Sequence, residues 1–330
     1  MPQLRQNIIT GEWVVFAPER AKRPSDYASI AQERKQSKKD CPFCIDSKKS
    51  AYCELLEGCE SRFTYAIQNK FPAFVEEPDI SCKKYLIENE FFAMKPAIGG
   101  HDVIVVKDHD QSISKFTEEI WEDLFESFKC RYRHYVKIPN VEYVMPIYNH
   151  KPQAAASIEH PHAQIFASAV VPNTVSRELT HTAQYHSDHK TCAFCDLIDH
   201  EKAQNTRLLF ENDDFVAFTF YAARFPFEIW IMPKKHSSDF YAMSEGQTKS
   251  LAEISRKVFS RLDETLGDPP VNFFIHSAPV NDDGKLEYYH WHLEVAPRLA
   301  LYGGYELGSG MIIDIIAPEQ AAEYLRMNKK

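Results

Sequence analysis

Residues 160–164 read His-Pro-His-Ala-Gln, and the rest of the chain can be understood outward from this stretch. In an extended strand, side chains two residues apart point to the same face, so His160, His162 and Gln164 share one surface. Neighbours in this row lie about 7 Å apart by the rise per residue. Proline donates no ladder hydrogen bond, which indicates the end or edge of a strand. Taken alone, the pattern favours a surface strand with two unrelated histidines.

A unit that ends in this stretch occurs twice along the chain. Each copy has two cysteines three residues apart, then a single histidine, then a His-x-His pattern, and the second copy closes with His-Trp-His-Leu-Glu at residues 290–294. The single histidine precedes the His-x-His pattern by 51 residues in the first copy and by 54 in the second. The second cysteine precedes that histidine by 65 residues in the first copy and by 41 in the second. The difference is the size of a loop insertion. A duplication explains this order better than coincidence does.

Apolar periodicity predicts the same elements in both copies. Short β-branched or aromatic runs predict strands at 102–106 and 227–232, and a helical stripe follows each of them, at 118–135 and 245–266. Further strands are predicted at 141–148 and 271–276. Each copy therefore has the element order strand, strand, helix, strand, strand. This order predicts an α+β fold with antiparallel sheets and flanking helices. We place the units at 1–180 and 181–330, with a linker over 169–190.

The cysteines and histidines of each copy predict a metal site. Two thiolates and two imidazoles suit tetrahedral, structural zinc, and the chain offers this set twice. The predicted ligands are Cys41, Cys44, His109 and His160 for the first zinc, and Cys192, Cys195, His236 and His290 for the second. The alternative for each single histidine is an ordinary exposed side chain at a helix start. Four further cysteines stay unassigned, and a reducing compartment makes a structural disulfide among them improbable.

Composition excludes several classes of protein. The 330 residues are 44% hydrophobic and carry a formal net charge of −9. A core of two domains or lobes is therefore expected, and extended binding to nucleic acid or anionic membranes is not. The first residues contain no apolar signal-peptide core, and no apolar run is long enough to span a membrane. A cytoplasmic protein is the simplest expectation.

If zinc takes His160, then His162 remains as the reactive group of the row. A histidine can attack phosphorus and form a covalent nucleotidyl-enzyme, which divides one displacement into two. The amide of Gln164 can hydrogen-bond a phosphoryl oxygen as charge shifts. The predicted reaction class is nucleotidyl transfer at an α-phosphorus.

With these motifs in place, the chain resembles the galactose-1-phosphate uridylyltransferase family, a branch of the histidine-triad superfamily. The resemblance implies two tandem histidine-triad-like units, and it covers nearly the whole chain. The segments that carry it are 18–24, 68–73, 157–164, 223–228, 289–294 and 304–310.

The resemblance also implies roles for individual residues. His162 would become uridylylated, with Gln164 and Ser157 on the phosphoryl oxygens. The remaining contacts would be Arg20 and Arg23 at the nucleotide phosphates, and Asn69 and Asn149 at the nucleotide. UDP-glucose would lose glucose 1-phosphate, and galactose 1-phosphate would collect the uridylyl group, as in galactose metabolism. Family members are commonly homodimers.

Departures from the family keep other functions open. The family carries a glycine-rich segment before its His-x-His, whereas this chain has Lys151 and Ala155 there. These residues remove backbone freedom, and Lys151 offers a point charge for a phosphate. One alternative is therefore a phosphorylase or adenylyltransferase acting on ADP-glucose or a dinucleoside polyphosphate. Another is a non-catalytic nucleotide-binding histidine-triad protein. Glu294 replaces glutamine in the second copy, which we expect to be catalytically silent.

Overall fold

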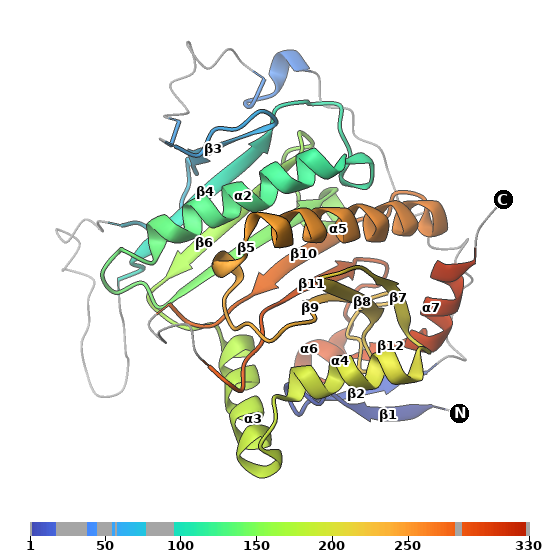
Figure 1. The fold of residues 1–330 in the computed structure, drawn as a ribbon. Helices are drawn as coiled ribbons and strands as arrows, with labels where there is room; N and C mark the ends of the chain where they lie inside the picture. The colour runs from blue at the N-terminus through green and yellow to red at the C-terminus, as the bar shows by residue number, and fades with distance from the viewer. Residues whose placement is uncertain are drawn as a thin grey trace.

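The computed structural model describes residues 2–17, 38–44, 55–56, 58–76, 96–280 and 286–327 (Figure 1). Within these ranges, nine strands form one sheet in the order β3-β4-β6-β5-β10-β11-β9-β8-β7, and three more form a small sheet in the order β1-β2-β12. The strands of the large sheet are β3 (Thr64–Gln68), β4 (Gly99–Val106), β5 (Tyr143–His150), β6 (His162–Ser168), β7 (Leu208–Glu211), β8 (Phe215–Thr219), β9 (Ile229–Pro233), β10 (Val271–His276) and β11 (His292–Pro297). Those of the small sheet are β1 (Gln3–Gln6), β2 (Trp13–Phe16) and β12 (Ile313–Asp314).

The large sheet displays the duplication directly. Its first half has the order β3-β4-β6-β5, and its second half repeats this arrangement as β8-β9-β11-β10. All pairs within the large sheet are antiparallel, and β5 joins β10 where the halves meet. The predicted α+β fold of two tandem units is confirmed. The unit boundary that we placed after residue 180 falls inside the helix α3 (Asn173–His189).

Two long helices cover one face of the sheet. These are α2 (Glu118–Tyr135) and α5 (Glu245–Leu266), which cross the sheet side by side and match the predicted ranges (Figure 1). Each begins at a hydroxyl cap, because Thr117 and Ser244 accept hydrogen bonds from backbone N–H groups of the first turn. Between the helices, Trp121 packs against Phe259 with ring centroids 4.9 Å apart. The larger apolar core of the described residues lies between these helices and this face of the sheet.

The opposite face is built differently in the two halves. Under the second half lies an apolar core formed with the small sheet, α3 (Asn173–His189) and α4 (Ala193–Gln204). The segment 169–190, which we expected to be a linker, is thus mostly the helix α3. Two further helices, α6 (Gly304–Ser309) and α7 (Pro318–Arg326), follow the last long strand. Short 3-10 turns occur at Lys38–Asp40, Ile113–Lys115, Pro152–Ala154 and Phe240–Ala242.

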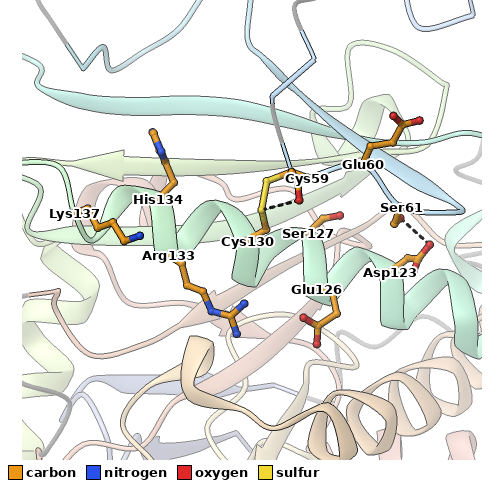
Figure 2. Close-up of a pocket in the computed structure, with 11 residues that line it drawn as sticks. Cys59, Glu60, Ser61, Asp123, Glu126, Ser127, Cys130, Arg133, His134 and Lys137 are labelled. Carbon is orange, nitrogen blue, oxygen red and sulfur yellow. Dashed lines mark hydrogen bonds between the residues drawn. A yellow bond between two sulfur atoms is a disulfide. The ribbon is translucent and has the colours of Figure 1, made fainter.

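One expectation about cysteines is wrong. The structure pairs Cys59 with Cys130 in a disulfide with a Cα–Cα distance of 6.1 Å, whereas we expected no structural disulfide. Cys59 precedes β3 and Cys130 lies on α2, so packing of the helix over the edge strand brings them together, which the sequence spacing does not reveal. The disulfide lines a cavity of about 520 Å³ (Figure 2). Beside it, Asp123 accepts hydrogen bonds from the Ser61 hydroxyl and the Phe63 N–H, which also fastens β3 to α2.

Among the helices that the structure describes, none combines the length and the apolar character needed to cross a membrane.

Candidate active site

His162 and Gln164, the reactive residues of the 160–164 stretch, lie on the sheet face that points away from α2. The register of β6 with β4 pairs His162 with Val105 and Gln164 with Val103. The alternate residues of β6, Ala163 and Ile165, enter the core under α2. This alternation sends His162 and Gln164 to the opposite face, as the sequence predicts.

A cavity of about 350 Å³ opens over these two residues. Asn69 and Ser157 line it together with His162 and Gln164, so four of the predicted site residues meet in one place. Phe43 and Val103 contribute apolar walls, and the ring of Phe43 lies 5.3 Å from that of His162. An apolar pocket with a few convergent polar groups is the usual form of a small-molecule site.

The hydrogen bonds of His162 leave one ring nitrogen available. Its Nδ1 lies 2.8 Å from the carbonyl oxygen of His160, and a carbonyl only accepts, so Nδ1 carries the proton. The lone pair is therefore on Nε2. Burial lowers the pKa of His162, which keeps the ring neutral at physiological pH. A neutral, oriented imidazole in a pocket fits a nucleophile.

The first predicted metal cluster comes together beneath this site. The ligand atoms of Cys41, Cys44, His109 and His160 all lie within 4.8 Å of one another. Both imidazoles present Nδ1, at 3.1 Å and 3.3 Å from the sulfur of Cys44. Nε2 of His160 donates to the carbonyl of Val106 at 2.6 Å, and burial lowers the pKa of His160 to about 4. This is the neutral, oriented form that a metal ligand requires.

The donor chemistry of this cluster fits a cation. Burial and the neighbouring Cys41 raise the pKa of Cys44 to about 11. The Cys44 thiol therefore stays protonated at neutral pH unless a cation lies beside it. Two thiolates with two neutral imidazoles are a common zinc set.

The second cluster repeats this geometry in the other half. The ligand atoms of Cys192, Cys195, His236 and His290 also lie within 4.8 Å of one another. Nδ1 of each histidine faces the sulfur of Cys195, at 3.4 Å for His236 and 3.6 Å for His290. Each Nε2 donates to a backbone carbonyl, that of Leu286 or of Pro233. Both clusters of the prediction could thus hold a metal ion.

Sequence reasoning missed His101 on β4. Its Nε2 lies 2.7 Å from Oε1 of Gln164 and 3.0 Å from Nδ2 of Asn69, so His101 sits between these two amides. No sequence motif contains His101, because its place beside Gln164 follows from the pairing of β4 with β6. Only an assumed register of these two strands could have predicted that place.

The remaining predicted residues are not among those that line this cavity, and two of them lie outside the described ranges. Asn149 lies on β5, and its Oδ1 accepts a hydrogen bond from Asn272 of the second half at 2.7 Å. The ammonium of Lys151 lies 2.8 Å from the carboxylate of Asp268, also in the second half. Its role at a phosphate stays a prediction. Arg20 and Arg23 lie outside the described residues.

The second half holds a buried polar cluster where the first half has its pocket. Glu178, His276, His292 and Glu294 bring their ligand atoms within 4.8 Å of one another, and all four are buried. Arg224 forms an ion pair with Glu294, so this cluster already contains a cation of its own. Although burial opposes ionisation, Arg224 lowers the pKa of Glu294 to about 2. Glu178 reaches this cluster from the helix α3.

Comparison with known proteins agrees with this architecture. Residues 1–172 match the family model described as galactose-1-phosphate uridyl transferase, N-terminal domain, and residues 178–329 match its C-terminal domain. An ADP-glucose phosphorylase of Arabidopsis thaliana is 30% identical over 338 residues, which span 98% of this chain and 92% of the relative. A galactose-1-phosphate uridylyltransferase of Thermotoga maritima is 26% identical, over 99% and 98% of the two chains.

Solved structures give the same result. The crystal structure of the Arabidopsis thaliana ADP-glucose phosphorylase with bound ADP-glucose covers 100% of both chains, with a TM-score of 0.83 and 29% identity. A uridylyltransferase structure covers 99% of this chain and 98% of its own, with a TM-score of 0.76 and 25% identity. The family models together span nearly the full length of the sequence. The chain therefore belongs to the galactose-1-phosphate uridylyltransferase family of nucleotidyltransferase enzymes.

Proposed function

We propose that this enzyme is a UDP-glucose–hexose-1-phosphate uridylyltransferase that works in two steps through a nucleotidyl group on His162. The observation that carries the proposal is the available Nε2 of His162 in a cavity that Asn69, Gln164 and Ser157 also line. The hydrogen bond from Nδ1 of His162 to the carbonyl oxygen of His160 orients the ring. The acceptor would be galactose 1-phosphate.

The chemistry needs no external base. Nε2 of His162 attacks the α-phosphorus, a P–N bond forms, and the P–O bond to the sugar phosphate breaks with its electron pair on the leaving phosphate. The modified ring keeps its proton on Nδ1 and becomes cationic, and the carbonyl oxygen of His160 stabilises that charge. In the second step a phosphate oxygen of the acceptor attacks the same phosphorus, and the P–N bond breaks.

The polar groups of the cavity suit the charge that develops on phosphorus. We assign Gln164 and Ser157 to the phosphoryl oxygens and Asn69 to the nucleotide, because all three line the cavity that contains His162. Asn149, Lys151 and the two N-terminal arginines, Arg20 and Arg23, are proposed as further nucleotide or phosphate contacts.

We propose zinc for both Cys/His clusters. The thiol and imidazole donors favour it, and each would hold the Cys-x-x-Cys segment of a half against its sheet. Elemental analysis should give two zinc ions per chain, and Cys192→Ser should remove one of them. One zinc or none in the native chain would contradict the assignment.

A specific observation favours a second candidate function. The relative at 30% identity and the structural neighbour with a TM-score of 0.83 are ADP-glucose phosphorylases, and that structure contains ADP-glucose. An adenylyl group on His162 with free phosphate as the acceptor would use the same residues and the same steps.

The two candidates differ in which nucleotide labels the protein. Purified enzyme is incubated with UDP-glucose or ADP-glucose, and its intact mass is measured. A UMP adduct that galactose 1-phosphate discharges supports the first candidate, whereas an AMP adduct that phosphate discharges supports the second. Tight nucleotide binding without any adduct would contradict both.

We further propose a cytoplasmic homodimer. Leu301 and Leu307, near α6, are 93% and 74% exposed, and such a surface suits a subunit contact. The four free cysteines of the two Cys/His clusters suit a reducing compartment, whereas the Cys59–Cys130 disulfide is a bond that such a compartment disfavours. Light scattering on the purified chain tests the dimer, and fractionation of the source cells tests the location.

A further inference from the structure

His101 lies between the side-chain amides of Asn69 and Gln164, which both line the cavity. It lies on β4, is 7% exposed, and its ring stacks on Phe166 of β6 with centroids 3.9 Å apart. Its two ring nitrogens meet three partners, namely the backbone N–H of Ala73, the side chain of Gln164 and the side chain of Asn69. The nature of these partners decides which nitrogen carries the proton.

The backbone contact fixes the tautomer. The N–H of Ala73 lies 3.3 Å from Nδ1 of His101, and a backbone N–H can only donate. Nδ1 must then present its lone pair. Burial lowers the pKa of His101, so the ring is neutral and its single proton is on Nε2. This N–H points at Gln164, whose nearest amide atom lies 2.7 Å away and must be the oxygen.

The orientation of both amides follows from this tautomer. Oε1 of Gln164 accepts from His101, which leaves the amino group of Gln164 for the cavity. Oδ1 of Asn69 accepts from the N–H of Phe71 at 2.9 Å, so its amino group is the atom 3.0 Å from Nε2 of His101. Two donors form no hydrogen bond with each other, and the amino hydrogens of Asn69 are left for another acceptor.

We propose that His101 is a positioning residue that holds the Gln164 amide with its N–H groups toward the reacting phosphate. With the amide reversed, a carbonyl oxygen would face the phosphoryl oxygens and repel them as their charge grows. The inference rests on the proposed function, since it assigns His101 a task in the attack by His162. It acts through Gln164 and touches no substrate itself.

The second half supports the assignment by contrast. Trp230 pairs with Glu294 as Val103 pairs with Gln164, so Glu228, two residues before Trp230, occupies the position of His101. Glu228 accepts hydrogen bonds from Trp230 and from the backbone N–H of Arg224. In the first half, the residue at this position therefore donates to the amide of Gln164. In the second half it is a carboxylate, and the donor that meets Glu294 is Arg224, from outside the two strands.

A double-mutant cycle on the full, zinc-loaded chain tests the inference. His101→Phe keeps a stacking ring but removes the donor, and it should slow formation of the nucleotidyl-enzyme about 100-fold with little change in nucleotide affinity. His101→Gln, which keeps an N–H near the same place, should recover at least about tenfold of that loss. In a Gln164→Ala background, His101→Phe should change the rate by less than about threefold. Equal losses in both backgrounds, or a loss confined to affinity, would overturn the inference.

A second measurement does not depend on activity. In ¹⁵N-histidine-labelled enzyme, the signals of His101 are assigned by their loss in His101→Phe. We expect a protonated Nε2 and an unprotonated Nδ1, and the reverse would overturn the inference. If the wild-type chain forms no adduct with any nucleotide sugar, the proposed function fails, and the tautomer still decides whether His101 orients Gln164.

Discussion

The first half of the sheet contains a pocket, whereas the second half, built on the same strand order, is filled. The difference lies in three matched positions. Val103, Ile67 and Asn69 of the first half correspond through the strand registers to Trp230, Phe218 and Phe220 of the second. Trp230 stacks on Phe220 with centroids 3.9 Å apart and also on His292 at 4.5 Å. The two halves therefore differ here in side-chain volume rather than in backbone arrangement, and we propose that this volume decides which copy receives a ligand.

The polar positions of the two halves differ in charge. The neutral Gln164 and His101 of the first half correspond to Glu294 and Glu228 of the second. Arg224 pairs with Glu294, and His276 pairs with Glu178, whose pKa is lowered despite its burial. Burial instead raises the pKa of Glu228. A neutral amide accepts an incoming phosphate, whereas a buried ion cluster has no place for one. We therefore propose that the duplicated unit serves as a site in the first copy and as a structural core in the second.

The largest expected effect is on the nucleophile. His162→Ala should abolish the nucleotidyl-enzyme and lower turnover by at least about 10⁴-fold, because no other imidazole presents a lone pair to the cavity among the described residues. His292→Asn is the matched change in the second half, and it should leave turnover within about threefold once zinc content is shown to be normal. Equal losses in both variants would break the comparison.

Exchanging Val103 and Trp230, which differ in side-chain volume at matched positions, tests why only the first half has this pocket. Val103→Trp should fill the cavity and weaken nucleotide binding at least about 100-fold, measured by calorimetry, with little loss of stability. The reverse change, Trp230→Val, should lower the free energy of unfolding by about 3 kcal/mol, because it leaves a void in the core. Nucleotide binding at a second site in Trp230→Val would show that volume alone closes that half.

Exchanging the charged residues tests the electrostatic difference. Gln164→Glu should reduce the rate of nucleotidylation about 100-fold, because a carboxylate repels the phosphoryl oxygens. Glu294→Gln should leave the rate unchanged but lower the free energy of unfolding by about 3 kcal/mol, since Arg224 loses its buried partner. Rapid-quench kinetics and denaturant unfolding measure the two outcomes. A full rate in Gln164→Glu would contradict the role of the amide.

The smallest effect concerns the loop before the His-x-His pattern of the first half. Lys151 and Ala155 both have positive φ angles, 70° and 66°, so the backbone keeps a conformation that favours glycine even though the glycines are absent. Ala155→Gly should raise the free energy of unfolding by about 0.5–1 kcal/mol. Ala183→Gly, in the interior of α3, is the control and should lower it by about 1 kcal/mol.

Much of the fold was predictable because the duplication constrains it. The helical stripes fixed α2 and α5, and the matched order of cysteines and histidines identified both metal clusters. The helices follow from local periodicity, and the clusters follow from cysteine and histidine, which at this spacing are typical of metal sites. The row formed by His162 and Gln164 was predictable for the same reason, since a strand alternates its faces.

The rest depends on pairing that the sequence does not state. His101 meets Gln164 only through the register of β4 and β6, and Asn272 meets Asn149 only where β10 joins β5. The helix α3 was mistaken for a linker because its sequence is polar and His-rich. Of its buried residues Val175, Glu178 and Thr182, only Val175 is apolar. Lys151 was expected at a phosphate, and the sequence around it does not predict its ion pair with the distant Asp268.

The most direct test of the central claim is to map the nucleotidyl group within the enzyme. The zinc-loaded chain is treated with the nucleotide sugar that labels it, digested, and sequenced by mass spectrometry under conditions that preserve phosphoramidates. We predict one nucleotidyl group per chain, on His162, at every substrate concentration. A nucleotidyl group on His292, or two groups per chain, would contradict the division of roles between the halves.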